Sequence, residues 1–385
     1  MRRSVFTDDH EAFRSVMRDF MQQEVAPVFP EWTKQGHPPR DFYRRLGELG
    51  VLGIQVPQEY GGAGETSLKY SMVISEELTR AAVSFGNAPL HTNLILPYLL
   101  AYCTDEQKKR WLPAFATGEM MTAIAMTEPG TGSDLAGITT TARLSEDGTH
   151  YVLNGAKTFI TGGVLADLVL VVCRTSAAGD DDRRGGLTIL CVEASSEGYA
   201  VGRTLEKMGL RTSDTAELSF TDVRVPVENR LGEEGRAFAY LTHNLPQERL
   251  TIAIDSYALA AGALRQAVDY VQGRTVFGRP VASYQNTKFV LAECATELEA
   301  MQVMVDRAVD LHDARELGAA DAAKVKLFCT ETASRIIDKC LQLHGGYGFM
   351  REYPIADYYT DIRVSRIYGG TSEVMKMIVS KSLGL

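Results

Sequence analysis

Residues 126–134 (MTEPGTGSD) concentrate hydroxyl and glycine residues that suit the binding of a polar ring edge or a phosphate. Thr127 and Ser133 supply hydroxyls that both donate and accept hydrogen bonds. Gly132 lets backbone N–H groups approach a ligand closely. Phe159 offers an aromatic face on which a flat ring can lie. Taken alone, the stretch fits equally well a polar turn between domains, with Phe159 in the core of a β domain.

A second set of candidate residues lies in the last third of the chain. Arg274, in the segment RTVFGRP, carries a planar fork of donors that suits bidentate contact with a pyrophosphate. Gly345 and Gly346, in the segment QLHGGYG, can end a helix and also let a backbone approach a ligand. Glu248, in the segment LPQERL, is a carboxylate of the kind that accepts protons in catalysis.

These segments, in this order along almost the whole chain, resemble the motifs of the acyl-CoA dehydrogenase family. Residues 157–161 (KTFIT) and 209–214 (GLRTSD) belong to the same set. The resemblance is closest to the long-chain branch, in which LPQERL occurs together with IYGGT, present here at residues 367–371. It implies an α+β multidomain fold, with an all-α N-terminal domain, a small β-barrel or sandwich and a C-terminal four-helix bundle.

The resemblance assigns most of the candidate residues to FAD. The family's counterparts of Arg274, Phe277 and Gln285 reach the FAD of a neighbouring subunit, which implies a homo-oligomer, either a tetramer or a dimer. Glu373 either contacts the cofactor or caps the helix that follows it. The expected FAD contacts are Met126, Thr127, Gly132, Ser133, Phe159, Ile160, Thr161, Arg274, Phe277, Gln285, Gln342, Gly345, Gly346, Thr371 and Glu373.

The catalytic base of the family occupies a different place in this chain. Most members carry it in the pattern Tyr-Glu-Gly-Thr, where this chain has Gly369. The long-chain and isovaleryl branches carry it in a Glu-Arg-Leu context, which implies that Glu248 is the base. Gly369 would leave room for that carboxylate and still offer its N–H to the thioester oxygen. The alternative is that Glu248 is an ordinary helix glutamate, paired with Arg249.

Pro246 suits the first turn of a helix, so we expect Glu248 to lie in such a turn. There the helix dipole would favour the ionised carboxylate, while burial beside a flavin would raise its pKa.

The resemblance also implies the substrate and the partner. The reaction is the α,β-dehydrogenation of a long-chain or branched acyl-CoA, with an electron-transferring flavoprotein as partner. Residues 85–100, where relatives end the acyl-tail pocket, are apolar with small residues and suit such a tail. Arg211 fits equally a solvated surface arginine. The expected substrate contacts are Ser133, Arg211, Arg249, Tyr368 and Gly370.

Other functions on the same fold stay open at this point. They are a flavin oxidase or monooxygenase, a dehydrogenase acting on an acyl-carrier-protein thioester, and a non-catalytic protein that binds flavin or acyl-CoA.

Three segments of different apolar periodicity would position these residues. Residues 1–120 carry apolar side chains at helical spacing. Residues 121–232 contain short apolar runs, such as LVLVV at 168–172, that indicate strands. Residues 233–385 return to helical spacing, with an apolar stripe from Leu250 to Val271 that predicts a long helix of a bundle.

Composition excludes several other classes of protein. A net charge of −9 without a Lys/Arg run argues against a nucleic-acid binder. The six cysteines show no Cys-x-x-Cys pair and no metal-ligand spacing, so we expect buried free thiols in a reducing cytosol and no metal site. No apolar run of about 18 residues indicates a membrane span.

Overall fold

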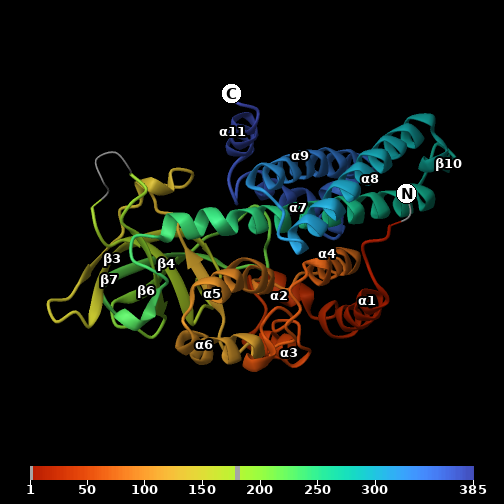
Figure 1. Ribbon diagram of the computed structural model, residues 1–385. Coiled ribbons are helices and arrows are strands. Elements are labelled where there is room, and N and C mark those ends of the chain that lie inside the picture. The colour runs from red at the N-terminus through yellow and green to blue at the C-terminus, as the bar shows by residue number, and fades with distance from the viewer. Residues whose placement is uncertain (1–2, 178–182) are drawn as a thin grey trace.

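The computed structural model describes residues 3–177 and 183–385. Its first part is helical, and Figure 1 shows these helices gathered below the long helices of the C-terminal part. The helix from residue 105 begins with a capping box, in which Thr104 Oγ1 accepts from Gln107 N at 3.2 Å and Thr104 N donates to Gln107 Oε1 at 2.9 Å. The helices are α1 (Asp8–Phe20), α2 (Phe29–Gln35), α3 (Arg40–Glu48), α4 (Lys69–Ala81), α5 (Leu96–Tyr102) and α6 (Asp105–Thr117).

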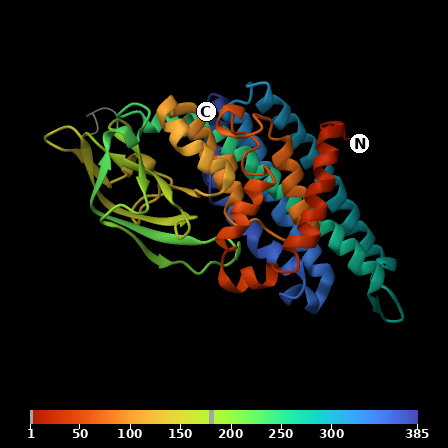
Figure 2. The ribbon, with the colours of Figure 1, turned by 90° about the horizontal axis from the view of Figure 1, so that it is seen from below.

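The middle part is an eight-stranded sheet that lies beside the helices (Figure 2). β4 and β5 pair antiparallel next to the edge strand β8, and they bury almost every side chain on both faces, which explains their unbroken apolar runs. One face packs against α5, α6 and the start of α7, and the other forms the core of the β domain itself. The strands are β1 (Thr122–Ala125), β2 (Thr141–Leu144), β3 (His150–Thr161), β4 (Leu168–Arg174), β5 (Leu187–Glu193), β6 (Tyr199–Thr204), β7 (Thr215–Pro226) and β8 (Arg230–Leu231).

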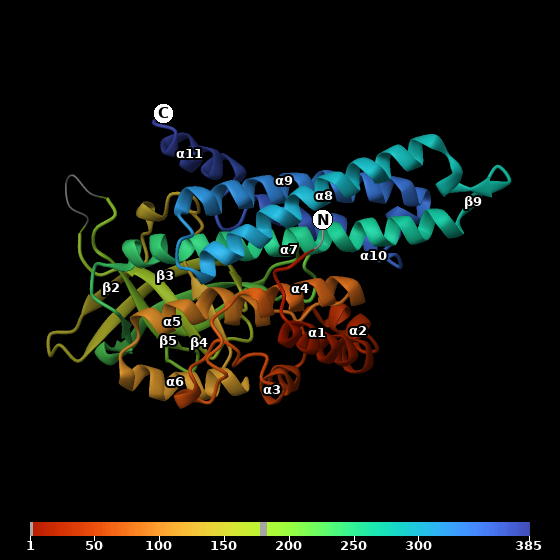
Figure 3. The same ribbon diagram turned by 45° about the vertical axis from the view of Figure 1, so that its right-hand side comes forward.

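The last part is a bundle built on α7 (Ala237–Gly273), α8 (Gln285–Asp313) and α9 (Ala319–His344). Apolar residues of all three, with others from α4 and α10 (Pro354–Asp361), form one core. A hairpin of β9 (Thr275–Val276) and β10 (Arg279–Pro280) joins α7 to α8 and projects from the end of the bundle (Figure 3). α11 (Ser372–Ser382) ends the chain. The predicted helix–sheet–helix architecture is therefore confirmed, while the domain limits at residues 120 and 232 stay a prediction.

The position of Glu248 in α7 differs from the prediction that it lies in the first turn of a helix. The helix begins at Ala237 and runs through Pro246 without interruption, so Glu248 lies in its interior and not in its first turn. The dipole of a helix N-terminus acts only within about one turn. It therefore does not favour the ionised form of Glu248.

The structure also describes the cysteines and the apolar character of the helices. All six cysteines are free and buried, as predicted. Across residues 3–177 and 183–385, no helix is long and apolar enough to cross a membrane.

Candidate functional site

The loop at residues 126–134 is held in place by a buried ion pair that the sequence did not reveal. The Glu128 carboxylate accepts from Lys157 Nζ at 2.9 Å, and from the backbone N–H groups of Thr139 at 2.7 Å and Thr140 at 2.9 Å. Burial opposes ionisation of Glu128, but these hydrogen bonds outweigh it and lower its pKa to about 2. Lys157 Nζ also donates to Met126 O at 2.9 Å. The pair thus fixes the loop against β3 and leaves Gly132 and Ser133 exposed.

Phe159 has the geometry of a residue that faces a ligand. It lies in β3 where the pairing with β7 shifts register, between Lys157 and Ile160. Its φ of 59° is in the left-handed region, which costs a residue with a Cβ about 1–2 kcal/mol. Its ring is nevertheless 68% exposed. Such strain around an exposed aromatic is typical of binding sites.

The neighbours of Phe159 differ in their surroundings. The side chain of Ile160 is 2% exposed and belongs to the core of the β domain, so a cofactor contact from this residue would come from its backbone. Thr161, at the end of β3, is half-buried. Thr127 is also half-buried, and its carbonyl accepts from Thr158 N at 3.0 Å.

Glu248 and Gly369 lie against each other, as predicted. A Cβ added to Gly369 would stand 3.3 Å from Glu248 Oε1, so the glycine makes room for the carboxylate. Glu248 Oε2 is buried and has no hydrogen-bond partner among the described residues. Burial raises the pKa of Glu248 to about 6, although Arg249 and Lys326 act in the opposite sense. A carboxylate of this kind is ionised at neutral pH and free to accept a proton.

The turn at residues 368–370 is held by two cations from the bundle. Arg249 Nε donates to the carbonyl of Gly369 at 3.3 Å. Lys326, from α9, donates to the carbonyls of Tyr368 and Gly370, the first at 2.5 Å. Sequence reasoning missed Lys326, because nothing in the sequence shows that its helix position faces this turn.

The other residues of the C-terminal motif lie where α11 begins. Thr371 is the N-cap of α11 and accepts from Val374 N at 3.3 Å. Glu373 follows in the first turn, where hydrogen bonds from its own backbone and from Thr371 lower its pKa. These contacts favour the capping role of Glu373 over a cofactor contact.

The loop at residues 207–214 is attached both to the N-terminal helices and to the bundle. Leu210 N donates to Asp361 Oδ1 at 2.5 Å, and Ser213 Oγ donates to Asn87 Oδ1 at 2.5 Å. Arg211 is half-buried, and none of the described contacts brings it beside Glu248. Its role in substrate binding therefore stays a prediction.

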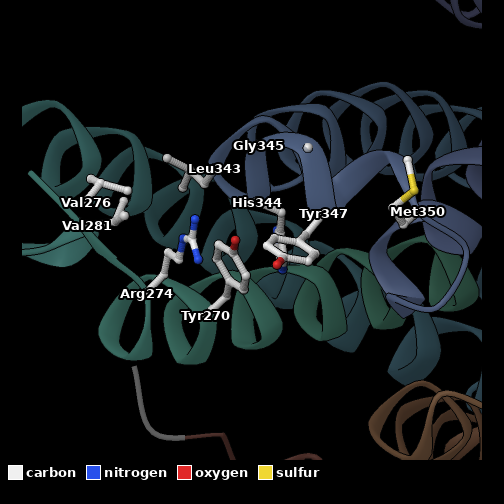
Figure 4. Close-up of a pocket in the computed structure, with 10 residues that line it drawn as sticks. Tyr270, Arg274, Val276, Val281, Leu343, His344, Gly345, Tyr347 and Met350 are labelled. Carbon is white, nitrogen blue, oxygen red and sulfur yellow. The ribbon is translucent and has the colours of Figure 1, made fainter.

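A pocket of about 450 Å³ lies at the far end of the bundle (Figure 4). Arg274, Gly345 and Gly346 line it together, as expected for one ligand site, and Gln342 is two residues before His344 on α9. Arg274 forms no salt bridge within residues 3–177 and 183–385, so its fork is available to an anion. Sequence reasoning missed the aromatic lining of Tyr270, His344 and Tyr347, in which the Tyr270 and His344 rings stack at 4.5 Å.

Phe277 occupies the tip of the hairpin beyond this pocket. It is 97% exposed and has a φ of 49°. Gln285 begins α8 on the other side of the hairpin. The contact of Phe277 with the FAD of a neighbouring subunit therefore stays a prediction.

The two sets of expected FAD contacts, residues 126–161 and 274–346, lie toward opposite ends of α7. Ala237, at the start of α7, packs against the β domain, whereas Arg274 directly follows the other end of α7. The 37 residues of α7 span about 55 Å. Met126 of the first set packs in the same core as Ala237, whereas the second set lies beyond the other end of this helix.

A small second pocket, of about 30 Å³, lies between α4 and the segment that precedes α5. Asn93 lines it, and the Asn93 carbonyl accepts at 3.0 Å from Nε2 of Gln247, which precedes Glu248 in the sequence. Apolar Phe85 and Ala88 line it, as expected for residues 85–100, but so do polar Thr92 and Asn93 of the same stretch. The stretch is therefore less apolar toward the pocket than its sequence indicates.

Tyr98 is a further residue that sequence reasoning did not single out. It is fully buried, and its hydroxyl has no hydrogen-bond partner among the described residues. Burial, together with the nearby Glu248 carboxylate, raises its pKa.

Comparison with known proteins agrees with this arrangement. Three domain descriptions of the acyl-CoA dehydrogenase family match the chain, the N-terminal domain over residues 7–119, the middle domain over 123–223 and the C-terminal domain over 235–384. The mitochondrial long-chain specific acyl-CoA dehydrogenase of Rattus norvegicus is 39% identical over 99% of this chain and 88% of its own length. The acryloyl-CoA reductase (NADH) of Anaerotignum propionicum is 34% identical over 98% of this chain and 95% of its own.

Solved structures agree as well. The crystal structure of an acyl-CoA dehydrogenase from Geobacillus kaustophilus superposes with a TM-score of 0.95 at 44% identity, covering 99% of each chain. Butyryl-CoA dehydrogenase from Megasphaera elsdenii superposes with a TM-score of 0.92 at 32% identity, covering 100% of each chain.

Proposed function

The chain belongs to the acyl-CoA dehydrogenase family, and from this membership we propose that it oxidises a long-chain or branched acyl-CoA to the trans-2-enoyl-CoA, with Glu248 as the base. One observation carries the assignment of the base. The Glu248 carboxylate lies in the space that Gly369 leaves, with Oε2 buried and without a partner. A buried carboxylate oxygen without a hydrogen bond is costly in a folded protein, so a function is the natural reason for its retention.

Each residue of the site has its own role in the proposed reaction. Glu248 accepts the proton that leaves Cα of the acyl group. The N–H of Gly369 donates to the thioester oxygen and stabilises the negative charge that develops there. Bound FAD supplies the acceptor for the hydride that leaves Cβ. Arg249, Tyr368 and Gly370 would contact the thioester side of the substrate.

We propose that two chains share each FAD. Phe159, with its strained backbone and exposed ring, would lie against the flavin, near the hydroxyls of Thr127, Ser133 and Thr161. The pocket at Arg274 would receive the pyrophosphate and adenosine of an FAD bound to a second chain. The separation of the two sets along α7 supports this sharing, and we therefore propose a homo-oligomer, a dimer or a tetramer.

Two features of the cellular setting complete the proposal. An electron-transferring flavoprotein would reoxidise the flavin, as the family resemblance implies. The six free, buried thiols suit a reducing cytosol, where we place the protein.

Anaerobic titration with acyl-CoAs tests the proposal. We expect the flavin absorbance near 450 nm to bleach with one class of acyl-CoA and Glu248→Gln to slow this bleaching by at least about 10²–10⁴-fold while FAD stays bound. Glu316→Gln, at an exposed position, is the matched control and should bleach as the wild type does.

Three results would contradict the proposal. Wild-type bleaching by Glu248→Gln excludes Glu248 as the base. A spectrum unmoved by every acyl-CoA excludes the reaction and favours an acyl-carrier-protein substrate or a binding role. Rapid reoxidation of the reduced flavin by air, without a dye acceptor, indicates an oxidase or a monooxygenase.

A further inference from the structure

The turn that carries Gly369 has an uncommon set of hydrogen bonds. Its three successive carbonyls all accept from buried cations, the Tyr368 and Gly370 carbonyls from Lys326 Nζ and the Gly369 carbonyl from Arg249 Nε. Gly369 and Gly370 both have positive φ values, of 62° and 96°. The carbonyls of the turn are thus drawn toward the bundle.

The ammonium group of Lys326 is buried, and the loss of its hydration is unfavourable. Its side chain is 1% exposed, and it forms no salt bridge with any of the described residues. Burial lowers its pKa to about 8, with Glu248 acting in the opposite sense, so its ammonium stays protonated at neutral pH. A buried ammonium is retained only where strong hydrogen bonds compensate for its lost hydration. Here the compensating groups are the two carbonyls of the turn.

The planarity of the peptide bond connects Lys326 to the thioester. The peptide between Tyr368 and Gly369 is trans, so its carbonyl and its N–H point in opposite directions. Lys326 holds the carbonyl, and the Gly369 N–H is thereby directed away from α9. Among the described residues this N–H has no acceptor, and a Cβ on the same residue would stand 3.3 Å from Glu248 Oε1.

We propose that Lys326 is a positioning residue for the reaction, because it orients the Gly369 N–H toward the thioester oxygen. The positive charge of Lys326 also favours the ionised form of Glu248. The proposal rests on the function proposed above. It assigns Lys326 no contact with the substrate and no proton transfer.

Lys326→Met removes both the donor and the charge, whereas Lys326→Gln keeps a donor and removes only the charge. Lys324→Met, on the same helix but exposed, is the matched control. The probe is an acyl-CoA with sulfur in place of Cβ, which cannot be oxidised there, bound to the holoenzyme. Its thioester carbonyl stretch, measured by infrared difference spectroscopy, reports the strength of the hydrogen bond to its oxygen.

We expect the carbonyl stretch to move to higher frequency in Lys326→Met and to stay close to the wild-type value in Lys326→Gln. In both variants the acidic limb of the kcat/KM profile should move to higher pH. The kcat of Lys326→Met should fall about 10–100-fold with little change in KM, because a misdirected oxyanion donor acts mainly on the transition state.

An unchanged carbonyl band in folded, FAD-loaded Lys326→Met would overturn the proposal and leave Lys326 a structural role. If Lys326→Met does not retain FAD, the test relies on Lys326→Gln. An acidic limb of the kcat/KM profile at the wild-type pH in Lys326→Gln would also overturn the proposal. Measurements on the wild-type protein test the proposed function independently of the proposed role of Lys326. If it bleaches with acyl-CoA and lowers the carbonyl frequency of the probe, the proposed function stands whatever Lys326 does.

Discussion

Gly369→Ala should disturb the site because the new Cβ would contact two side chains of α7, Ile252 and Glu248. The new Cβ would stand 2.5 Å from Ile252 Cδ1 and 3.3 Å from Glu248 Oε1. Ile252 follows Glu248 by one turn of α7, so the same helix face supplies both neighbours. The φ of Gly369 is also positive, at 62°. The glycine is therefore required for its backbone and for the space that it leaves.

The magnitude follows from these distances. A left-handed φ costs a residue with a Cβ about 1–2 kcal/mol. A carbon–carbon contact of 2.5 Å lies well inside the optimum of about 3.5–4.0 Å, and such overpacking typically costs about 1–3 kcal/mol. Gly369→Ala should thus destabilise the holoprotein by about 2–5 kcal/mol. It should also slow flavin bleaching, because the Glu248 carboxylate must move.

Ile252→Val supplies the partner for a double-mutant cycle, because valine lacks Cδ1. Alone it should cost about 0.5–1.5 kcal/mol. In the double variant the overlap with Cδ1 disappears, so the two effects should fall short of additivity by about 1–3 kcal/mol. Gly50→Ala is the control, since Gly50 has a φ of 76° but nothing within 4 Å of an added Cβ. It should show the backbone cost alone.

Urea unfolding of the holoprotein, at fixed protein and FAD concentrations, measures all four proteins of the cycle. Anaerobic bleaching with acyl-CoA measures the site. Strict additivity of the two substitutions would refute the steric reasoning. Equal costs for Gly369→Ala and Gly50→Ala, with wild-type bleaching, would show that Gly369 does not make room for the base.

Three further predictions concern ionisation and assembly. Because Glu248 must be ionised to accept a proton and its pKa is about 6, kcat/KM should rise with pH up to about 6 and level off above it; a flat profile from pH 5 to 7 would contradict this. Burial raises the pKa of Asp255 from 3.8 to about 6 in the folded protein. The free energy of unfolding therefore falls as the pH rises from about 4 to about 6, because the buried carboxyl group must ionise. Asp255→Asn should therefore be more stable than the wild type by about 2–3 kcal/mol at pH 8, with the gain lost near pH 4; equal urea midpoints at pH 8 would refute it. Phe277→Ala should weaken both FAD retention and oligomer formation in analytical ultracentrifugation, whereas Leu144→Ala, also at an exposed position, should change neither; an unaltered oligomer with full FAD would count against a cofactor shared between chains.

Much of the architecture follows from local sequence patterns. Helical periodicity indicated the two helical parts, and the short apolar runs of β4 and β5 indicated strands. The capping hydrogen bonds of Thr104 at the start of α6 likewise involve only neighbouring residues. Such signals act over a few residues and are therefore visible in the sequence.

Pro246 shows the limit of a local rule. Proline is common in a first helical turn, but here it lies inside a helix of 37 residues. Packing of α7 against the sheet at one end and the bundle at the other overrides the local preference. The environment of Glu248 is consequently set by burial and not by a helix end.

The sequence by itself determined the family resemblance, the order of helices and strands, and the exchange of a glutamate for Gly369 with Glu248 as its candidate replacement. Only the tertiary structure decided that these two residues touch, that Lys326 and Arg249 hold the carbonyls of the turn, and that the two sets of FAD contacts lie at opposite ends of α7. The physical reason is distance along the chain. More than a hundred residues separate Glu248 from Gly369, so their contact depends on how α7 packs, and no local pattern records that packing.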